Sequence, residues 1–414
     1  MNKKPSKNHT FIDLYAGCGG LSLGLMQAGW TGIFAVEKSK DAFQTLSHNL
    51  CREDARFQFQ WPEWFPCEPM STWQVLKHYS SHLKKLKGEV DLIAGGPPCQ
   101  GFSSIGLRNP DDHRNQLTSE YIKIVSLVKP RFLLLENVRG FQAAFKGRKK
   151  PYSYHVKRRL EKLGYYVYSE MVEAWKFGVP QLRPRFIMVA VRKDLGPLNE
   201  NPFEYIESTI PSFRNERKLN GHRTTVFEAI SDLEVGDKIL RDSEEGKGFK
   251  EIKYKRSRLS PFQRLMRKDV TLGYAPNSLR LPNHRPETLK KFKEVLEVCP
   301  KGRPLSDEYR EHFNMKKQCF TPLHPLKIGR TITTLPDDTL HYSEPRILTV
   351  RENARLQSFP DWFEFQGKYT TGGNRRVKEC PRYTQVGNAV PPLMAEAIGL
   401  VLKDMKKSTE NEKA

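Results

Sequence analysis

The sequence has no long hydrophobic run and has fewer acidic than basic residues. Both features exclude some classes of protein function. Among 414 residues, Lys and Arg number 69 against 47 Asp and Glu, which leaves a formal charge of +22 at pH 7. This balance excludes an acidic, solvating protein and favours a polyanionic partner, either nucleic acid or an anionic membrane surface. The longest clean apolar runs, such as Phe186–Val191, are far too short to cross a bilayer. The basic amino terminus lacks the apolar core of a signal peptide, so we expect a cytoplasmic protein without a membrane anchor.

Cysteines at metal-binding or redox spacing are also absent. The seven cysteines are scattered, with no Cys-x-x-Cys pair and no Cys/His cluster. Neither a disulfide framework nor a structural zinc site is indicated, and the sequence predicts no metal. A reducing compartment is the simplest interpretation, and any special cysteine must be identified from its neighbours.

Strand-like and helix-like segments alternate through the first half of the chain. The predicted strands are 9–15, 33–36, 90–94, 132–135, 165–172 and 186–191. Helical segments separate the first four strands, which favours an α/β sheet with helices on both faces. The last two strands have no helix between them, so we expect them to form an antiparallel pair.

The composition changes over about 194–326, where apolar periodicity fades, charges mix and Pro and Gly recur. Within it, 252–268 carries seven Lys or Arg and no acid. A solvated charged face is the ordinary interpretation of such a run. Regular secondary-structure patterns return near residue 330. We therefore predict a first domain at 1–193, an inserted domain at 194–326, a return segment at 327–402 that completes the first domain, and a disordered tail at 403–414.

A glycine-rich turn follows the first predicted strand. Residues 13–20 read Asp-Leu-Tyr-Ala-Gly-Cys-Gly-Gly, and Glu37 stands at the end of the next strand. Glycines here allow a tight turn and close approach of a ligand, and the acid is placed to accept hydrogen bonds from ribose hydroxyls. Because Ser22 occupies the third glycine position of the dinucleotide pattern, the motif indicates a nucleoside ligand without a pyrophosphate. A purely structural strand–helix turn is the alternative.

Cys99 lies directly after the strand 90–94, in the run Gly-Gly-Pro-Pro-Cys-Gln-Gly-Phe-Ser. A cysteine at the carboxyl end of a central parallel strand points into the crevice where such folds bind ligands, and a positive environment would make it a nucleophile. The alternative is a small buried hydrophobic residue. The polar stretch 104–115 has the composition of a closing loop.

Three further charged residues are candidates for the same edge of the sheet. Glu136 follows three leucines in the run Leu-Leu-Leu-Glu-Asn-Val, and Arg183 and Arg185 lie in Gln-Leu-Arg-Pro-Arg. A carboxyl in an apolar setting can donate a proton or a hydrogen bond, although a cap or salt bridge is commoner for a lone Glu. Arginine can bind a phosphate or a base carbonyl, with a surface turn as the alternative. Because the carboxyl ends of parallel strands meet at one edge, we expect the glycine turn, Cys99 and Glu136 to converge.

Taken in order, these motifs resemble those of the DNA (cytosine-5)-methyltransferases of bacterial restriction–modification systems. The likeness includes Arg-Ile-Leu-Thr-Val-Arg-Glu at 346–352, Gln-Ser-Phe-Pro at 357–360 and Gln-Val-Gly-Asn-Ala-Val-Pro-Pro at 385–392. The Asp-Pro-Pro-Tyr type of signature, found in enzymes that methylate exocyclic amines, is absent. The resemblance implies a Rossmann-like, S-adenosylmethionine-dependent methyltransferase domain with a smaller inserted target recognition domain.

The resemblance implies methylation of carbon 5 of a specific cytosine in double-stranded DNA, with S-adenosyl-L-methionine as the methyl donor and no metal. By likeness, Cys99 adds to carbon 6 of a cytosine flipped out of the duplex, and Glu136 engages N3 and the amino group. Arg185, with Arg183 beside it, would hold the base carbonyl. The segment 194–326 would recognise the DNA sequence. The resemblance therefore implies that its basic run contacts DNA.

For the cofactor, the resemblance assigns seven positions, namely Tyr15, Gly17, Gly19, Glu37, Pro98, Leu117 and Asn388. Glu37 would bind the ribose and Leu117 would contact the adenine. Three features depart from the family pattern. The usual Phe is Tyr15, the residue after the acid is Lys38, and the acidic residue expected after the third strand has no counterpart, since the Trp-rich passage 61–73 occupies that region.

Two alternatives remain beside the DNA-methylating interpretation. A transfer-RNA cytosine-5 methyltransferase is suggested by Cys319-Phe320-Thr321, but the residues that follow depart from that group's signature. A catalytically inactive DNA-binding homologue is the other, and the intact Cys99 and Glu136 argue against it. We expect a monomer that acts as the modification component of a restriction–modification system, paired with an endonuclease of the same specificity.

Overall fold

The chain forms two compact units, each assembled from segments that are not continuous in sequence. The computed structural model describes residues 9–411 except 99–114, 145–149, 197, 199, 220, 237, 255–258, 272–273, 373–374 and 376–377. The first unit comprises Met1–Glu173, Pro184–Pro211 and Pro392–Ala414, and the second comprises Ala174–Arg183 and Ser212–Pro391. The first unit therefore uses both ends of the chain.

The first unit is built on a six-stranded sheet in the order β2-β1-β3-β4-β6-β5. The strands are β1 (Thr10–Leu14), β2 (Thr31–Val36), β3 (Leu92–Gly95), β4 (Phe132–Asn137), β5 (Tyr165–Glu173) and β6 (Pro184–Arg192). The first four are parallel, and β6 is antiparallel to both β4 and β5. Short apolar runs form the parallel strands because helices bury both faces of the sheet. The predicted α/β class and the predicted antiparallel pair are confirmed.

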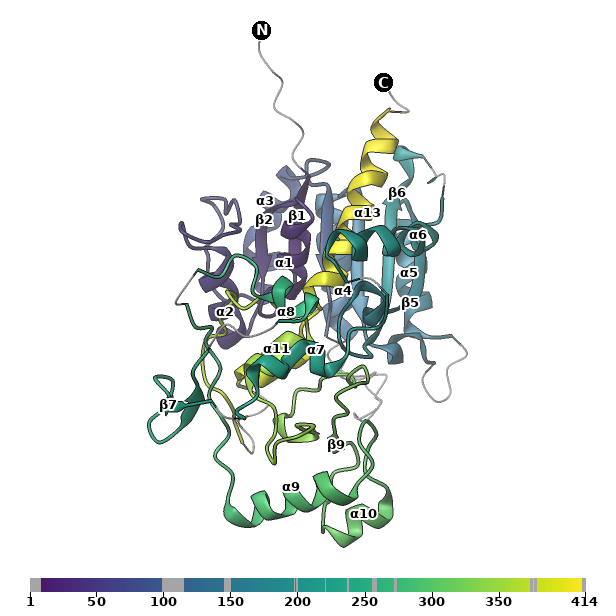
Figure 1. Cartoon of the computed structure of the whole chain (residues 1–414). Coiled ribbons are helices and arrows are strands. Elements are labelled where there is room, and N and C mark those ends of the chain that lie inside the picture. The colour runs from purple at the N-terminus through teal and green to yellow at the C-terminus, as the bar shows by residue number, and fades with distance from the viewer. Residues whose placement is uncertain are drawn as a thin grey trace. The chain divides into compact units, whose positions relative to one another are not determined.

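Helices cover both faces of this sheet (Figure 1). They are α1 (Gly20–Gln27), α2 (Lys40–Leu50), α3 (Thr72–Lys85), α4 (Asn115–Val128), α5 (Tyr152–Lys162) and α13 (Pro392–Asn411), while α6 (Pro202–Glu216) spans the division between the units. The carboxyl-terminal helix α13 packs on α1, and α3 packs on α4. The Trp30 indole nitrogen donates a hydrogen bond of 2.8 Å to the Gly399 carbonyl of α13. The last helix thus completes the first unit.

The Trp-rich passage packs on the sheet instead of forming a regular element. Trp61, Trp64 and Phe65 surround Phe34 of β2 at ring-centroid distances of 6.5, 5.8 and 4.5 Å. Aromatic rings at these separations stabilise a core beyond the area that they bury. The passage therefore closes the β2 edge of the unit.

The second unit consists of short helices and strands joined by long connections. Its helices are α7 (Val226–Ile230), α8 (Pro261–Met266), α9 (Pro286–Val298), α10 (Asp307–His312), α11 (Val350–Leu356) and α12 (Arg382–Asn388). Its strands are β7 (Leu240–Asp242), β8 (Lys250–Ile252), β9 (Thr321–Pro322) and β10 (Thr339–Leu340). The 3-10 helices of the chain are η1 (Arg139–Gln142), η2 (Ala174–Phe177), η3 (Lys193–Leu195), η4 (Ser231–Leu233) and η5 (Pro336–Asp338).

Buried ion pairs hold α11 in the second unit. Arg355 is fully buried, and its Nε lies 2.5 Å from Asp361 Oδ1 and its Nη2 3.2 Å from Asp232 Oδ2. Arg346 contacts Glu352 at 2.7 Å. Because removing one partner would leave a buried charge uncompensated, these pairs fix the position of α11. Throughout the described part of the chain, no helix is both long and apolar enough to span a membrane.

Candidate active site

Three parallel strands of the first unit end at the same edge of the sheet, and the segments that follow them lie against one another. An ideal Cβ built on Gly96, after β3, would lie 3.0 Å from Glu136 Oε2 at the end of β4. The Asn137 side chain donates a hydrogen bond of 3.1 Å to the Pro97 carbonyl. The turn after β3 is therefore tied to the end of β4. Residues 99–114, which include Cys99, lie outside the described residues, so the role of Cys99 stays a prediction.

Glu136 and Arg185 form a nearly buried ion pair at this edge. Arg185 Nε lies 2.8 Å from Glu136 Oε1, and the two side chains are 12% and 13% exposed. Arg185 comes from β6, whose antiparallel pairing with β4 brings it beside the carboxylate. Burial lowers the pKa of the Arg185 guanidinium, and the Glu136 charge opposes this effect. The pair presents a carboxylate and further N–H donors in one place.

Arg183 lies only two residues away but has different surroundings. It is 1% exposed and belongs to the second unit. Its Nη1 donates to the Ile332 carbonyl at 3.1 Å, and its Nη2 donates to the Gly387 and Ala389 carbonyls at 2.8 Å. These bonds join Arg183 to residues 332 and 387–389, all of the same unit. Asn388, the predicted cofactor residue there, is exposed at the end of α12.

Gly387 permits the close packing of the same motif. An ideal Cβ on Gly387 would lie 2.6 Å from the Thr333 carbonyl carbon and 2.8 Å from Thr334 Cα. Both are backbone atoms, which cannot move aside as the end of a flexible side chain can. Any larger residue would therefore displace α12 from the 333–334 segment.

The glycine turn after β1 and the carboxylate of Glu37 form a second part of the site. Glu37 Oε2 accepts a hydrogen bond of 3.0 Å from the Gly17 N–H, and Oε1 accepts one of 2.7 Å from the Ser39 N–H. Burial raises the pKa of Glu37, and these two N–H donors oppose the rise. Gly17 and Gly19 have φ values of +57° and +96°, which favour glycine.

The geometry of this turn fits a nucleoside. An ideal Cβ on Gly17 would meet no atom within 4 Å, so the backbone is open to a ligand beside the carboxylate. Each oxygen of Glu37 still has a lone pair to accept a hydrogen bond from a hydroxyl group. The structure also brings Tyr15 and Leu117 together, because the Tyr15 hydroxyl donates a hydrogen bond of 2.6 Å to the Leu117 carbonyl. Pro98 is half-buried at the end of the described β3 turn.

Residues 70–72 belong to this region, and sequence reasoning missed them. The Met70 N–H donates a hydrogen bond of 2.8 Å to the Glu37 carbonyl, so the chain returns to β2 after the Trp-rich passage. Ser71 then caps α3 in a capping box with Gln74. The Ser-x-x-Gln pattern is the sequence signal from which this helix start could have been predicted. The residue bonded to the Glu37 backbone is thus Met70, directly before the cap of α3.

Comparisons with known proteins identify the family of this chain. The sequence model of the C-5 cytosine-specific DNA methylases matches residues 9–404. The chain belongs to this family. It is 32% identical to the Type II methyltransferase M.DdeI of Desulfomicrobium norvegicum, over 94% of this chain and 86% of that relative. It is 31% identical to M.XorII of Xanthomonas oryzae pv. oryzae, over 96% and 86%.

Solved structures show the same fold. A protein described as a DNA modification methyltransferase encoded within an E. coli prophage aligns with a TM-score of 0.65 and 24% identity, over 96% of this chain and 99% of that one. The predicted family and fold class are confirmed, and the chain is a DNA cytosine-5 methyltransferase. The family implies S-adenosylmethionine as the methyl donor.

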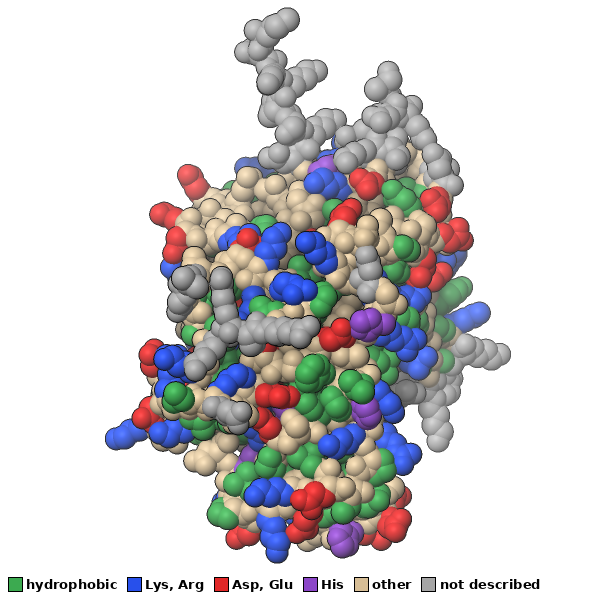
Figure 2. Space-filling view, in the orientation of Figure 1, with side chains coloured by type: hydrophobic (Ala, Val, Ile, Leu, Met, Phe, Trp, Pro, Cys, Tyr) green, Lys and Arg blue, Asp and Glu red, His purple; other side chains and the backbone are tan. Residues whose placement is uncertain are grey.

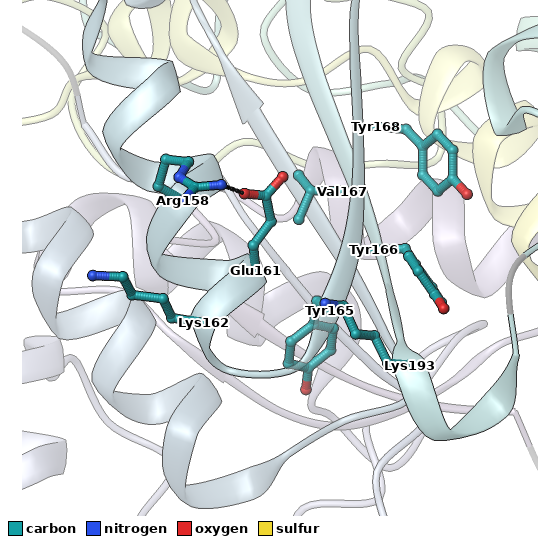
Figure 3. Close-up of a pocket in the computed structure, with 8 residues that line it drawn as sticks. All are labelled: Arg158, Glu161, Lys162, Tyr165, Tyr166, Val167, Tyr168 and Lys193. Atoms are coloured by element: carbon teal, nitrogen blue, oxygen red, sulfur yellow. Dashed lines mark hydrogen bonds and ion pairs between the residues drawn. The ribbon is translucent and has the colours of Figure 1, made fainter.

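The pocket drawn in Figure 3 lies away from the candidate site of this methyltransferase. It has a volume of about 480 Å³ and is lined by Arg158, Glu161, Lys162, Tyr165, Tyr166, Val167, Tyr168 and Lys193. These residues come from α5, the start of β5 and the first residue of η3, which follows directly after β6. Because β6 is antiparallel to β4, with Val191 opposite Phe132, the pocket lies at the amino end of β4. Glu136 stands at the other end of that strand.

Asp13 is a buried carboxyl in the glycine-turn motif that sequence reasoning did not single out. Ser22 Oγ donates a hydrogen bond of 2.5 Å to Asp13 Oδ2, whereas Oδ1 has no hydrogen-bond partner among the described residues. Burial raises the pKa of Asp13 from 3.8 to about 7, with the Ser22 bond opposing the rise. The folded state therefore binds a proton here that the unfolded chain releases at lower pH.

This proton makes stability fall as the pH rises from 3.8 to about 7. Below this window both states bind the proton, and within it each pH unit costs about 1.4 kcal/mol of unfolding free energy. We expect Asp13→Asn to remove this contribution, so that urea unfolding at pH 5 and pH 8 differs less than in the wild type. Asp54→Asn, at an exposed position of the same unit, is the control. An unchanged pH dependence in Asp13→Asn would contradict the assignment.

Proposed function

We propose that the protein methylates carbon 5 of one cytosine within a specific sequence of double-stranded DNA. It would act as a monomer and as the modification component of a restriction–modification system. The observation that carries the proposal is the Glu136–Arg185 ion pair at the carboxyl edge of the sheet, beside the turn that leads to Cys99. Family membership and the Type II methyltransferases among the relatives support it.

The chemistry follows from the poor nucleophilicity of carbon 5 of cytosine. Cys99 thiolate adds to carbon 6 of a base flipped out of the duplex, which makes carbon 5 electron-rich. Glu136 engages N3 and the amino group and draws electron density from the ring. Arg185 holds the carboxylate in place and directs a remaining N–H toward the base carbonyl. Carbon 5 would then take the methyl group that S-adenosylmethionine supplies, with S-adenosylhomocysteine as the leaving group. Loss of the carbon-5 proton and departure of Cys99 would restore the aromatic, methylated base.

S-adenosylmethionine supplies an electrophilic methyl group on a sulfonium. Glu37 would accept hydrogen bonds from the ribose hydroxyls, and the open backbone at Gly17 would let the nucleoside approach the turn. Leu117 would contact the adenine, while Pro98 and Asn388 would complete the pocket. No metal takes part in this proposal.

The segment 194–326 is proposed as the target recognition domain, with 1–193 and 327–402 forming the catalytic domain. On the face drawn in Figure 2, Lys and Arg side chains are spread over the surface. In α9, Lys290 and Lys293 are exposed. Such cations contact DNA phosphates, and they make binding strongly dependent on salt.

Bisulfite sequencing of plasmid DNA tests the proposal. The plasmid is taken from cells that express the protein and lack other cytosine methylation, with Cys99→Ala as the control variant. We expect protected cytosines within one short sequence context, and none with Cys99→Ala, because the alanine cannot add to carbon 6. Absence of protection although the protein is present and folded would overturn the proposal, and structured RNA would then be tested as the substrate.

A further inference from the structure

Tyr15 has an unusual backbone conformation in the glycine turn after β1. Its φ is +62°, in the left-handed region that bulky residues rarely adopt. Such a conformation costs free energy and persists only where surrounding contacts hold it. The contacts at the far end of this side chain therefore matter for the shape of the turn.

The Tyr15 hydroxyl joins three elements of the first unit. It donates a hydrogen bond of 2.6 Å to the Leu117 carbonyl in the first turn of α4. It also lies 2.9 Å from Thr72 Oγ1 at the start of α3. Thr72 is buried and is hydrogen-bonded in turn to the Glu120 carboxyl of α4. A phenylalanine at position 15 would fill the same space and make none of these bonds.

These contacts couple the glycine turn to the position of Leu117. Burial raises the pKa of the Tyr15 hydroxyl, so it keeps its proton and remains a donor at all ordinary pH values. The Leu117 carbonyl has two lone pairs, and the one not used within α4 is available to Tyr15. The first turn of α4 is thus fixed relative to the end of β1 by a side chain, in addition to hydrophobic packing.

We propose that Tyr15 is a positioning residue for the cofactor, acting through its hydroxyl. The hydrogen bond sets the distance between the glycine turn and Leu117, the two walls between which the adenosine part of S-adenosylmethionine would lie. This inference rests on the proposed function, because it assigns Leu117 to the cofactor pocket. Thr72 assists by holding the hydroxyl from the side of α3.

The test compares Tyr15→Phe with a matched control, Tyr121→Phe. Tyr121 is fully buried in the same helix α4, and its hydroxyl donates to the Ile93 carbonyl at 3.3 Å, outside the Tyr15 network. The dissociation constant of S-adenosylhomocysteine is measured by calorimetry, and kcat and KM for S-adenosylmethionine are measured on DNA. We expect Tyr15→Phe to raise the dissociation constant and KM about tenfold, with kcat within about threefold of the wild type. Tyr121→Phe leaves both binding constants unchanged.

Equal affinities for the wild type and Tyr15→Phe, or an equal loss in Tyr121→Phe, would overturn the inference. If Tyr15→Phe does not fold, Thr72→Val replaces it, since valine keeps the volume and removes the second hydroxyl. The valine variant must then also weaken S-adenosylhomocysteine binding, and unchanged affinity counts against the proposal. A wild-type protein that neither binds this compound nor methylates DNA would instead refute the proposed function.

Discussion

Glu136→Gln is expected to lower kcat for DNA methylation by about a hundredfold or more. The Glu136 carboxylate is almost buried and contacts Arg185 at 2.8 Å. Glutamine keeps the size of the side chain, but it carries no negative charge to balance the guanidinium or to stabilise a proton on N3 of the base. The defect is therefore expected in the chemical step.

The measurement is single-turnover methyl transfer to DNA at saturating S-adenosylmethionine. Affinity for S-adenosylhomocysteine should stay within about twofold of the wild type, because Glu136 is not among the proposed cofactor contacts. Glu170→Gln, at an exposed position on β5 of the same sheet, is the control and should react at the wild-type rate. Near-normal turnover of Glu136→Gln would exclude Glu136 from the reaction.

Gly24→Ala is expected to destabilise the first unit by about 3 kcal/mol, because it forces apart two helices that touch at the backbone. An ideal Cβ on Gly24 of α1 would lie 2.5 Å from the Pro392 carbonyl oxygen and 2.8 Å from the Glu396 nitrogen of α13. These are backbone atoms, so the clash cannot be relieved by a change of rotamer. The helices would have to separate, and buried apolar contacts would be lost.

Hydrogen exchange of the α1 and α13 amides measures this effect within the unit concerned. Gly372→Ala is a matched control, since a Cβ there would meet no atom within 4 Å. We expect faster exchange in both helices of Gly24→Ala and unchanged exchange in the control. Equal protection in the two variants would show that α13 does not depend on this contact.

Much of the first unit could be predicted because its secondary structure depends on local sequence. The strands β1 and β4 are short apolar runs, and each ends where a glycine turn or a polar residue interrupts the run. The absence of a helix between β5 and β6 correctly indicated an antiparallel pair. The order of the motifs was sufficient to predict the family. Cys99 lies outside the described residues, and its role and those of the other site residues stay predictions.

The surroundings of individual side chains could not be predicted in the same way. Arg183 and Arg185 stand in one motif, and the sequence suggested similar roles for them. In the structure Arg185 contacts Glu136, whereas Arg183 donates to carbonyls of the 332–389 region. The difference arises because each guanidinium meets segments that lie far from it in the sequence.

The sequence by itself determined the strands of the six-stranded sheet, most of the helices that cover it, the positions of the motifs and the chemical family. Hydrophobic periodicity and glycine turns act over a few residues, so they can be read locally. The tertiary structure alone decided that α13 packs on α1 at Gly24, that the Met70 N–H bonds the Glu37 carbonyl, and that the Tyr15 hydroxyl reaches Leu117. These contacts join segments distant in the chain, and their partners are selected by the packing of the whole unit.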